Sequence, residues 1–189
     1  MSEKRVCVFC GGNPGNNPEF MAAARHLGKE LARRNWGLVY GGATVGLMGA
    51  VADAALEAGG EVIGVIPNSL VQREMEHPGL TRNVRVDTLA QRKQIMFAES
   101  DAFLALPGGF GTLDEIFEAL TLGQIGEMAS KPCVLLNVDG FFNHLLGFLD
   151  QAQASGLLLP RYRTLLDSAF TIEQALGLLA SRFQAPPPG

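Results

Sequence analysis

The sequence contains few cysteines, no excess of positive charge and no long hydrophobic run, and each shortage excludes a class of protein. Its 15 lysines and arginines are scattered among 19 aspartates and glutamates, which gives a formal net charge of −4. Nucleic-acid binding would need a basic patch, and none is visible in the sequence. No apolar segment is long enough for a bilayer, and the amino terminus leads directly into a short apolar run. We therefore expect a soluble, cytoplasmic protein with neither a nucleic-acid nor a membrane partner.

The three cysteines, Cys7, Cys10 and Cys133, all lie within apolar runs. An odd number in such positions argues against the disulfide framework of a small secreted protein. Cys7 and Cys10 form a C-x-x-C, but Cys7 lies inside an expected strand, which favours buried thiols over a redox pair. The three histidines are far apart in the sequence and fit no metal-binding spacing, so we expect no metal site.

Apolar runs alternate with helical patterns along almost all of the 189 residues. The runs predict six strands, at residues 5–10, 37–40, 61–66, 84–86, 102–106 and 132–138. Because the strands are continuously apolar, they are typical of a parallel sheet covered by helices on both faces. We predict an α/β fold: a single doubly wound, Rossmann-like domain over residues 1–184. Residues 185–189, rich in proline, are expected to be a disordered or extended tail.

Three glycine-rich loops follow expected strands, after Cys10, Tyr40 and Leu106. The carboxyl ends of parallel strands meet at one edge of a sheet, where ligands bind at a switch in strand order. We therefore expect the three loops to line one edge. None of them has the dinucleotide-binding pattern G-x-G-x-x-G or the triphosphate-binding pattern G-x-x-x-x-G-K-[ST], so the site is expected to hold one phosphate.

The stretch Leu106–Glu115, LPGGFGTLDE, reads as a strand end, a glycine turn and a helix start. We predict that Thr112 caps this helix and that Glu115, three residues later, completes a capping box. The free N–H groups and the dipole of such a terminus favour a phosphate. A plain strand–helix turn without a ligand is the alternative at this point.

A guanidinium and a carboxylate are expected to join this phosphate site. Arg92 and Lys93 begin a helix after the fourth strand, and Glu115 lies one turn beyond the glycine turn. A carboxylate beside a phosphate-anchored sugar suits cleavage of a glycosidic bond, because it stabilises an oxocarbenium-like state or activates water. From spacing alone, a solvated helix face for Arg92 and Lys93 and a simple cap for Glu115 are equally open.

Residues 107–115 resemble the P-G-G-x-G-T-x-x-E signature of the Lonely Guy family, the cytokinin riboside 5′-monophosphate phosphoribohydrolases. Residues 91–96 are similar to its R-K-x-x-M motif, residues 41–49 to its second glycine loop, residues 8–11 to its start and residues 131–140 to a later strand. The resemblance implies hydrolysis of the N-glycosidic bond of an N6-modified adenosine 5′-monophosphate, without a cofactor, to free base and ribose 5-phosphate. It also implies a homodimer, with larger assemblies in some members, and sites near the dimer interface.

By the same resemblance, Arg92 and Glu115 are the catalytic pair. The residues that it assigns to substrate binding are Gly11, Gly42, Glu74, Lys93, Gly108, Gly109, Phe110, Gly111, Thr112, Leu113, Asp114 and Thr121. The chain departs from the family pattern at Gly12, where a serine is common, and at Leu89-Ala90, where Met-His is common. Both departures concern substrate preference more than the reaction, so plain AMP could serve as well as an isopentenyl derivative.

Two other functions fit parts of the pattern. A carrier of a phosphorylated cofactor such as molybdopterin needs the phosphate loop but no carboxylate, so Arg92 and Glu115 together favour the enzyme. A general purine or pyrimidine monophosphate nucleosidase is the other alternative, and the short chain without an extra domain weakens it. Lysine decarboxylase, an older family label, would need a pyridoxal phosphate lysine motif, and we find none.

Overall fold

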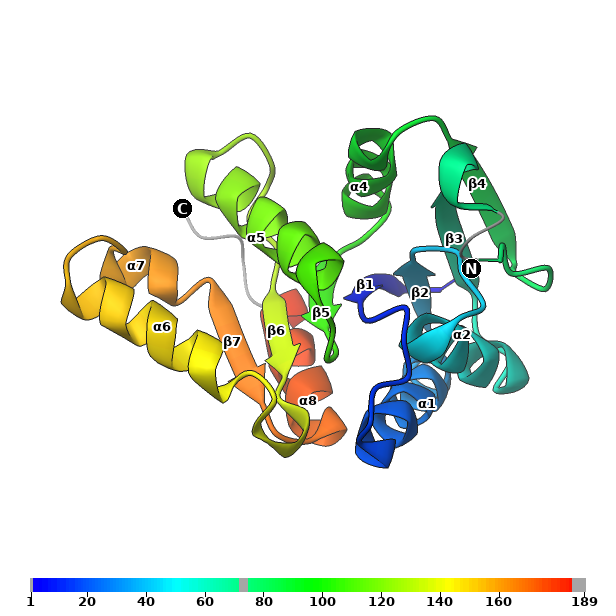
Figure 1. Ribbon diagram of the computed structural model, residues 1–189, viewed down its shortest axis with the longest axis horizontal. Helices are drawn as coiled ribbons and strands as arrows, with labels where there is room; N and C mark the ends of the chain where they lie inside the picture. Colours follow the sequence, from blue (N-terminus) through cyan, green and yellow to red (C-terminus); the bar gives the residue numbers. More distant parts are fainter. Residues whose placement is uncertain (1, 72–74, 185–189) are drawn as a thin grey trace.

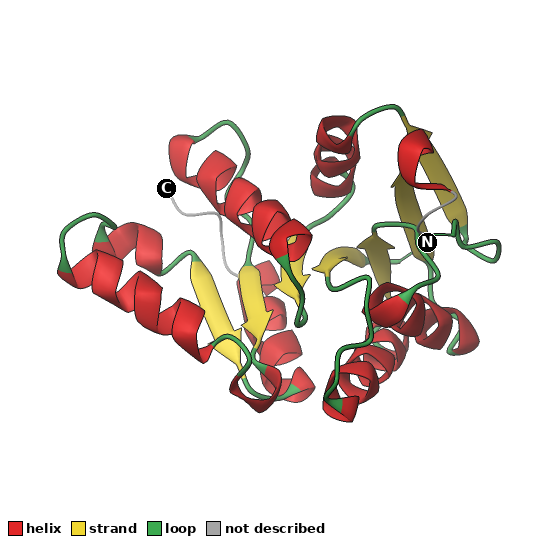
Figure 2. Ribbon diagram, viewed as in Figure 1, coloured by secondary structure: helices red, strands yellow, loops and turns green. Residues whose placement is uncertain are grey.

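The structure, a computed structural model, describes residues 2–71 and 75–184. In this part of the chain, seven parallel strands form one sheet in the order β4-β3-β2-β1-β5-β6-β7 (Figures 1 and 2). The strands are β1 (Lys4–Phe9), β2 (Trp36–Tyr40), β3 (Val62–Pro67), β4 (Arg82–Val86), β5 (Ala102–Ala105), β6 (Cys133–Leu136) and β7 (Leu166–Ala169). The predicted α/β fold with a doubly wound parallel sheet is confirmed. The expected tail, residues 185–189, lies outside the described residues.

Helices cover both faces of the sheet. They are α1 (Pro18–Arg33), α2 (Gly46–Glu57), α4 (Leu89–Ala98), α5 (Phe110–Ile125), α6 (Asn143–Ala154), α7 (Pro160–Arg163) and α8 (Ile172–Gln184), with 3-10 turns η1 (Asn68–Leu70) and η2 (Val138–Gly140). Alternate residues of β1 enter two separate cores. Val6 and Val8 pack with residues of α1, α2 and α8, whereas Phe9 packs with residues of α4, α5 and α6. Burial on both faces explains why the central strands are apolar throughout.

The two cysteines of the C-x-x-C belong to opposite cores. Cys7 packs on the α4–α5 side of the sheet and Cys10 on the α1–α2 side. All three cysteines are free and buried, as the sequence predicted. Burial raises the pKa of the Cys7 thiol well above its ordinary value. A redox pair is therefore excluded by the pleat of β1, which directs the two side chains apart.

The sequence prediction missed β7, the last strand at one edge of the sheet. Only its first and last residues, Leu166 and Ala169, are buried, and Asp167 and Ser168 between them are polar. An edge strand pairs on one side alone, so it does not need the continuous apolar character that marked the central strands.

The chain switches direction across the sheet at β1. It proceeds outward through β2, β3 and β4 and then returns to the other side of β1 with β5. The loops after β1 and β5 therefore lie side by side at the carboxyl edge, and the Gly11 amide donates to the Pro107 carbonyl oxygen over 3.0 Å. This is the switch point at which such sheets bind ligands.

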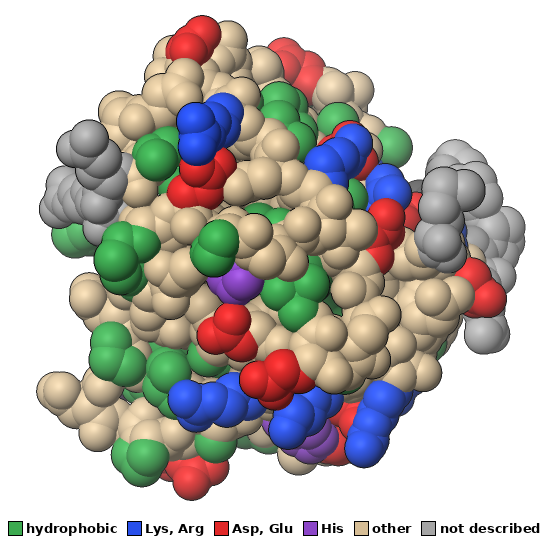
Figure 3. Space-filling model, turned by 90° about the vertical axis from the view of Figure 1, so that its right-hand side faces the viewer, with side chains coloured by type: hydrophobic (Ala, Val, Ile, Leu, Met, Phe, Trp, Pro, Cys, Tyr) green, Lys and Arg blue, Asp and Glu red, His purple; other side chains and the backbone are tan. Residues whose placement is uncertain are grey.

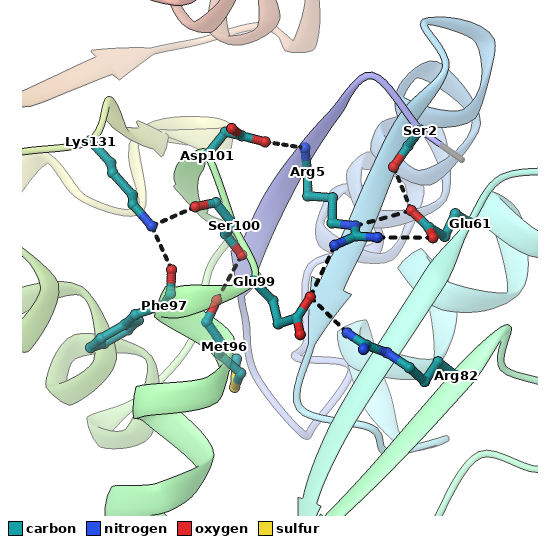
Figure 4. A network of polar contacts seen from close by, with 10 residues as sticks. All are labelled: Ser2, Arg5, Glu61, Arg82, Met96, Phe97, Glu99, Ser100, Asp101 and Lys131. Atoms are coloured by element: carbon teal, nitrogen blue, oxygen red, sulfur yellow. Dashed lines mark hydrogen bonds and ion pairs between the residues drawn. The ribbon is translucent and has the colours of Figure 1, made fainter. Parts of the chain in front are cut away.

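A network of charges joins the strands at the opposite, amino edge of the sheet (Figure 4). The Arg5 guanidinium donates to Glu61 from Nε over 3.1 Å and to Glu99 from Nη1 over 2.9 Å. Arg82 pairs with the same Glu99 over 2.7 Å, and Asp101 accepts from the Arg5 amide over 2.8 Å. The network links β1 to β4, to the start of β3 and to the end of α4.

The surface that faces the viewer in Figure 3 carries basic side chains next to acidic ones, so charge of one sign does not gather there. Among residues 2–71 and 75–184, no helix has the length and apolar character needed to cross a membrane.

Candidate active site

A cavity of about 720 Å³ opens at the switch point. Its wall combines the first glycine loop (residues 10–15), Gly41 after β2, Arg92 on α4, the loop and first residues of α5 (residues 107–112) and Glu115. As predicted, residues from all three glycine loops meet at one edge of the sheet. The volume lies within the range of pockets that bind small molecules.

Helix α5 begins earlier than the sequence predicted. Its N-cap is Gly109 and its first residue is Phe110, so Thr112 is inside the helix and caps nothing. The first intrahelical bond runs from the Leu113 amide to the Gly109 carbonyl oxygen, over 3.1 Å. The amides of the first turn have no intrahelical acceptor, and the glycine at the N-cap supplies no side chain to replace one. This turn lines the cavity, which makes it suited to an anion.

Thr112 is buried against the glycine turn. Only 3 % of Thr112 is exposed, and a Cβ placed on Gly108 would lie 2.0 Å from its hydroxyl oxygen. The same Cβ would lie 2.9 Å from the amide nitrogen of Gly11. Glycine at position 108 therefore allows the first and third loops and the start of α5 to approach one another closely.

Arg92 is buried, with 7 % of its surface exposed, on the first turn of α4. Its Nε donates to the Val65 carbonyl oxygen over 3.0 Å, and Nη2 donates to the Gly41 carbonyl oxygen over 2.8 Å. A Cβ on Gly41 would lie 1.8 Å from Nη2, so only glycine leaves room for the guanidinium. The ends of β2 and β3 thus fix the plane of this charged group.

Glu115 lies in the second turn of α5, half-buried, and lines the same cavity as Arg92. Both groups act on Cys10 at the end of β1. Burial raises the pKa of the Cys10 thiol well above its ordinary value, the Glu115 carboxylate raises it further and the Arg92 guanidinium lowers it. Cys10, Arg92 and Glu115 all line the cavity, beside a helix start suited to an anion.

The cavity contains eight of the fourteen residues that the resemblance implied. They are Gly11, Arg92, Gly108, Gly109, Phe110, Gly111, Thr112 and Glu115. Gly42 is outside the lining; its carbonyl oxygen accepts from the His77 amide over 2.9 Å. Glu74 lies outside the described residues.

Leu113, Asp114 and Thr121 line a second, more open groove of about 510 Å³ on the outer face of α5. Lys93 pairs with carboxylates of this helix, with Asp114 over 2.8 Å and also with Glu118. Burial lowers the pKa of Lys93, but the bonds to the two carboxylates outweigh it and leave the pKa above its ordinary value. These four predicted residues thus lie beside the cavity and not in its lining.

Three apolar side chains of the cavity, Phe20, Met48 and Phe141, were absent from the sequence prediction. The rings of Phe20 and Phe141 meet edge to face with centroids 5.4 Å apart. Phe141 follows β6, so the rule that strand carboxyl ends share one edge could have found it. Phe20 and Met48 lie in the first turns of helices after the glycine loops, where they read as ordinary core residues.

The family model described as "possible lysine decarboxylase" matches residues 48–179. Among curated proteins, a probable cytokinin riboside 5′-monophosphate phosphoribohydrolase of Oryza sativa subsp. japonica is 44% identical over 185 residues, 98% of this chain and 74% of its own. A cytokinin riboside 5′-monophosphate phosphoribohydrolase of Arabidopsis thaliana is 46% identical over 166 residues, 88% of this chain and 78% of its own.

Solved structures share the fold at lower identity. A molybdenum cofactor carrier protein of Chlamydomonas reinhardtii superposes with a TM-score of 0.73 at 23% identity, covering 96% of this chain and 99% of that one. A molybdenum cofactor binding protein of Rippkaea orientalis gives a TM-score of 0.72 at 25% identity, covering 97% and 99%. The architecture is thus shared by proteins whose names describe different functions.

Proposed function

The chain belongs to the Lonely Guy family, the cytokinin riboside 5′-monophosphate phosphoribohydrolases, and on that premise we propose how its cavity performs the reaction. The protein is an enzyme, a nucleotide N-glycosyl hydrolase with the phosphoribohydrolase activity of this family. The observation that carries the proposed mechanism is the meeting of Arg92, Glu115 and the uncapped first turn of α5 in one cavity.

The 5′-phosphate binds at the first turn of α5. The amides of Phe110, Gly111 and Thr112 donate to its oxygens, and the helix dipole adds to the attraction. Gly108 and Gly109 let the phosphate approach the main chain closely. This anchor places the ribose toward Glu115, which lies further along the same helix.

Hydrolysis then breaks the bond between C1′ and the base nitrogen. The electron pair leaves with the base, and positive charge develops on C1′ and the ring oxygen of the ribose. The Glu115 carboxylate stabilises this charge and accepts a proton from the water whose oxygen bonds to C1′. The departing base takes up a proton from solvent and Glu115 releases to solvent the proton that it accepted, so the products are the free base and ribose 5-phosphate. Arg92, permanently charged and held by two carbonyl oxygens, orients the reacting groups.

A carrier function without hydrolysis is the alternative raised by the structural neighbours. Binding of a phosphorylated cofactor would use the start of α5 but would gain nothing from a carboxylate in the same cavity. A pyridoxal phosphate enzyme would need a lysine in the cavity. No lysine is among the described residues that line it, and Lys93 pairs with Asp114 and Glu118.

We also propose a homodimer that forms through the outer groove of α5. Phe110 is 93 % exposed at one end of this groove, and Leu113, Phe117 and Leu122 continue it along the helix. An interface there would bring Asp114 and Thr121 next to a second copy, which is how residues outside the cavity would contact substrate. The three free, buried cysteines support a cytoplasmic location.

The test is to incubate the purified protein with AMP and with isopentenyl-AMP and to measure free base by chromatography. We expect base from both nucleotides and far less from adenosine, which lacks the phosphate anchor. Absence of base from every monophosphate, with binding retained, would overturn the proposed hydrolysis and favour the carrier alternative.

A further inference from the structure

His77 is a buried side chain outside the cavity whose ring is held from both sides. It is 7 % exposed, and its Nδ1 accepts from the Gly79 amide over 3.1 Å. Since Nδ1 is an acceptor, the ring hydrogen is assigned to Nε2, which donates to Oδ1 of Asp53 on α2 over 2.9 Å. The ring therefore fastens residues 75–79 to α2.

Residues 75–77 in turn hold the second glycine loop. The His77 amide donates to the Gly42 carbonyl oxygen over 2.9 Å. Residue 44 adds two bonds to the same segment: the Thr44 amide and the Thr44 hydroxyl both donate to the Met75 carbonyl oxygen, each over 2.9 Å. Met75 has a φ of 50°, a left-handed conformation that a residue with a side chain keeps only when its surroundings enforce it.

The held loop contacts Arg92 directly. The Gly41 carbonyl oxygen accepts from Nη2 of Arg92 over 2.8 Å, and Gly41 is bonded to Gly42, whose carbonyl oxygen His77 holds. Gly42 has a φ of 78°, so the loop turns sharply between these two carbonyl groups. A rotation of residues 41–44 would move the acceptor that fixes one side of the guanidinium.

We propose that His77, oriented by Asp53, is a positioning residue for Arg92. It acts through the contact of residues 75–77 with Gly42 and through the Gly41 carbonyl group. The inference rests on the proposed function, in which Arg92 acts on the bound nucleotide. Neither His77 nor Asp53 lines the cavity, so their effect on turnover passes through the loop.

Asp53 offers the cleaner variant because its side chain is 62% exposed and its removal leaves no buried void. We expect Asp53→Ala to lower kcat roughly 3- to 10-fold and His77→Ala roughly 10- to 100-fold, the scale of a catalytic group displaced by about 1 Å. KM for AMP should change much less. Asp53→Asn keeps an oxygen that accepts from Nε2, so it should restore most of the turnover.

A double-mutant cycle with Arg92→Lys separates positioning from general damage. If His77 acts through Arg92, Asp53→Ala should cost little further turnover in the Arg92→Lys protein. Fully multiplicative losses would overturn the proposal, as would unchanged kcat in both Asp53→Ala and folded His77→Ala.

The matched control is His26→Ala. His26 forms a second, exposed pair between a histidine and an acid, with Glu173 over 3.6 Å, and neither residue lines the cavity. Its turnover should equal that of the unmodified protein. If the unmodified protein itself releases no base, the proposed function fails, and that outcome is distinct from failure of the His77 proposal.

Discussion

At the residue scale, the site depends on charged groups that the backbone holds in place. Arg92 is almost fully buried, and its guanidinium donates hydrogen bonds to two carbonyl oxygens at the ends of neighbouring strands. A buried charge without such partners would be strongly destabilising. The requirement for glycine at position 41 follows from the same contact, since any side chain there would collide with Nη2.

The first prediction concerns Glu115. Glu115→Gln keeps the size of the side chain but removes its negative charge, so turnover of AMP should fall at least about 100-fold, the scale of a lost acid–base group. The nucleotide should still bind, because the phosphate contacts at the start of α5 are unchanged. Steady-state kinetics and binding calorimetry check both parts. A loss of less than tenfold would show that Glu115 is not the catalytic carboxylate.

We expect base preference to depend on the apolar side of the cavity. Phe20, Met48 and Phe141 offer apolar surface that an isopentenyl group can cover and an unmodified amino group cannot. Phe141→Ala should lower kcat/KM for isopentenyl-AMP about 10-fold, the value of a few apolar contacts, and that for AMP less. Competition between the two nucleotides measures the ratio. Equal losses for both would place the isopentenyl group elsewhere.

At the element scale, the start of α5 shows what residue patterns can and cannot predict. The sequence predicted a strand, a glycine turn and a helix here, and all three are present. It also predicted a capping box at Thr112 and Glu115, which was wrong. A capping box is present instead at the start of α4. There the Thr88 side chain accepts a hydrogen bond from the Gln91 amide, and the Gln91 side chain accepts one from the Thr88 amide. The pattern Ser/Thr-x-x-Glu/Gln occurs at several places in the sequence, so it does not by itself locate a helix start. At α5, the packing of the glycine loops places the start of the helix before Thr112.

The glycine turn gives the prediction at this scale. Gly108→Ala should raise KM for AMP at least about 10-fold and lower the free energy of unfolding by about 1–3 kcal/mol, because its Cβ would collide with Thr112 and with the Gly11 amide. Urea unfolding and kinetics measure the two effects.

The matched control is Gly147→Ala, an exposed glycine within α6 whose Cβ would meet nothing within 4 Å. It should leave KM unchanged and stabilise the protein by about 0.5–1 kcal/mol, the difference in helix propensity. An unchanged KM in Gly108→Ala would contradict the close approach of the loops.

At the scale of the whole molecule, the sheet has the candidate site at one edge and a network of ion pairs at the other. The glycine loops and Arg92 occupy the carboxyl edge, while Arg5, Glu61 and Glu99 join strands at the amino edge (Figure 4). The sequence predicted the first edge because glycine loops have a recognisable composition. It gave no sign of the second, since ion pairs between residues more than fifty positions apart leave no local pattern.

The amino edge predicts a dependence of stability on pH. At this edge, the hydrogen bond that the Arg5 guanidinium donates to Glu61 lowers the pKa of the Glu61 carboxyl from 4.5 to about 2. The resulting stability is present above pH 4.5 and is lost as the pH falls toward 2, because the unfolded chain takes up the proton first. We expect a contribution of about 1–2 kcal/mol after allowance for solvent screening.

Glu61→Gln should be less stable at neutral pH and should lose less stability on acidification. Urea midpoints across this range test it, and parallel curves for the two proteins would refute it.

The hydrogen bond from Gly11 to Pro107 joins the first loop to one that follows more than half of the chain later. The proposed active site consequently depends on contacts between segments remote in sequence, which are the slowest kind to form. A nascent chain carries no catalytic cavity until β5 and the start of α5 have left the ribosome and docked on β1. Because the nucleotide binds only the completed arrangement, it should shift the folding equilibrium of the entire sheet.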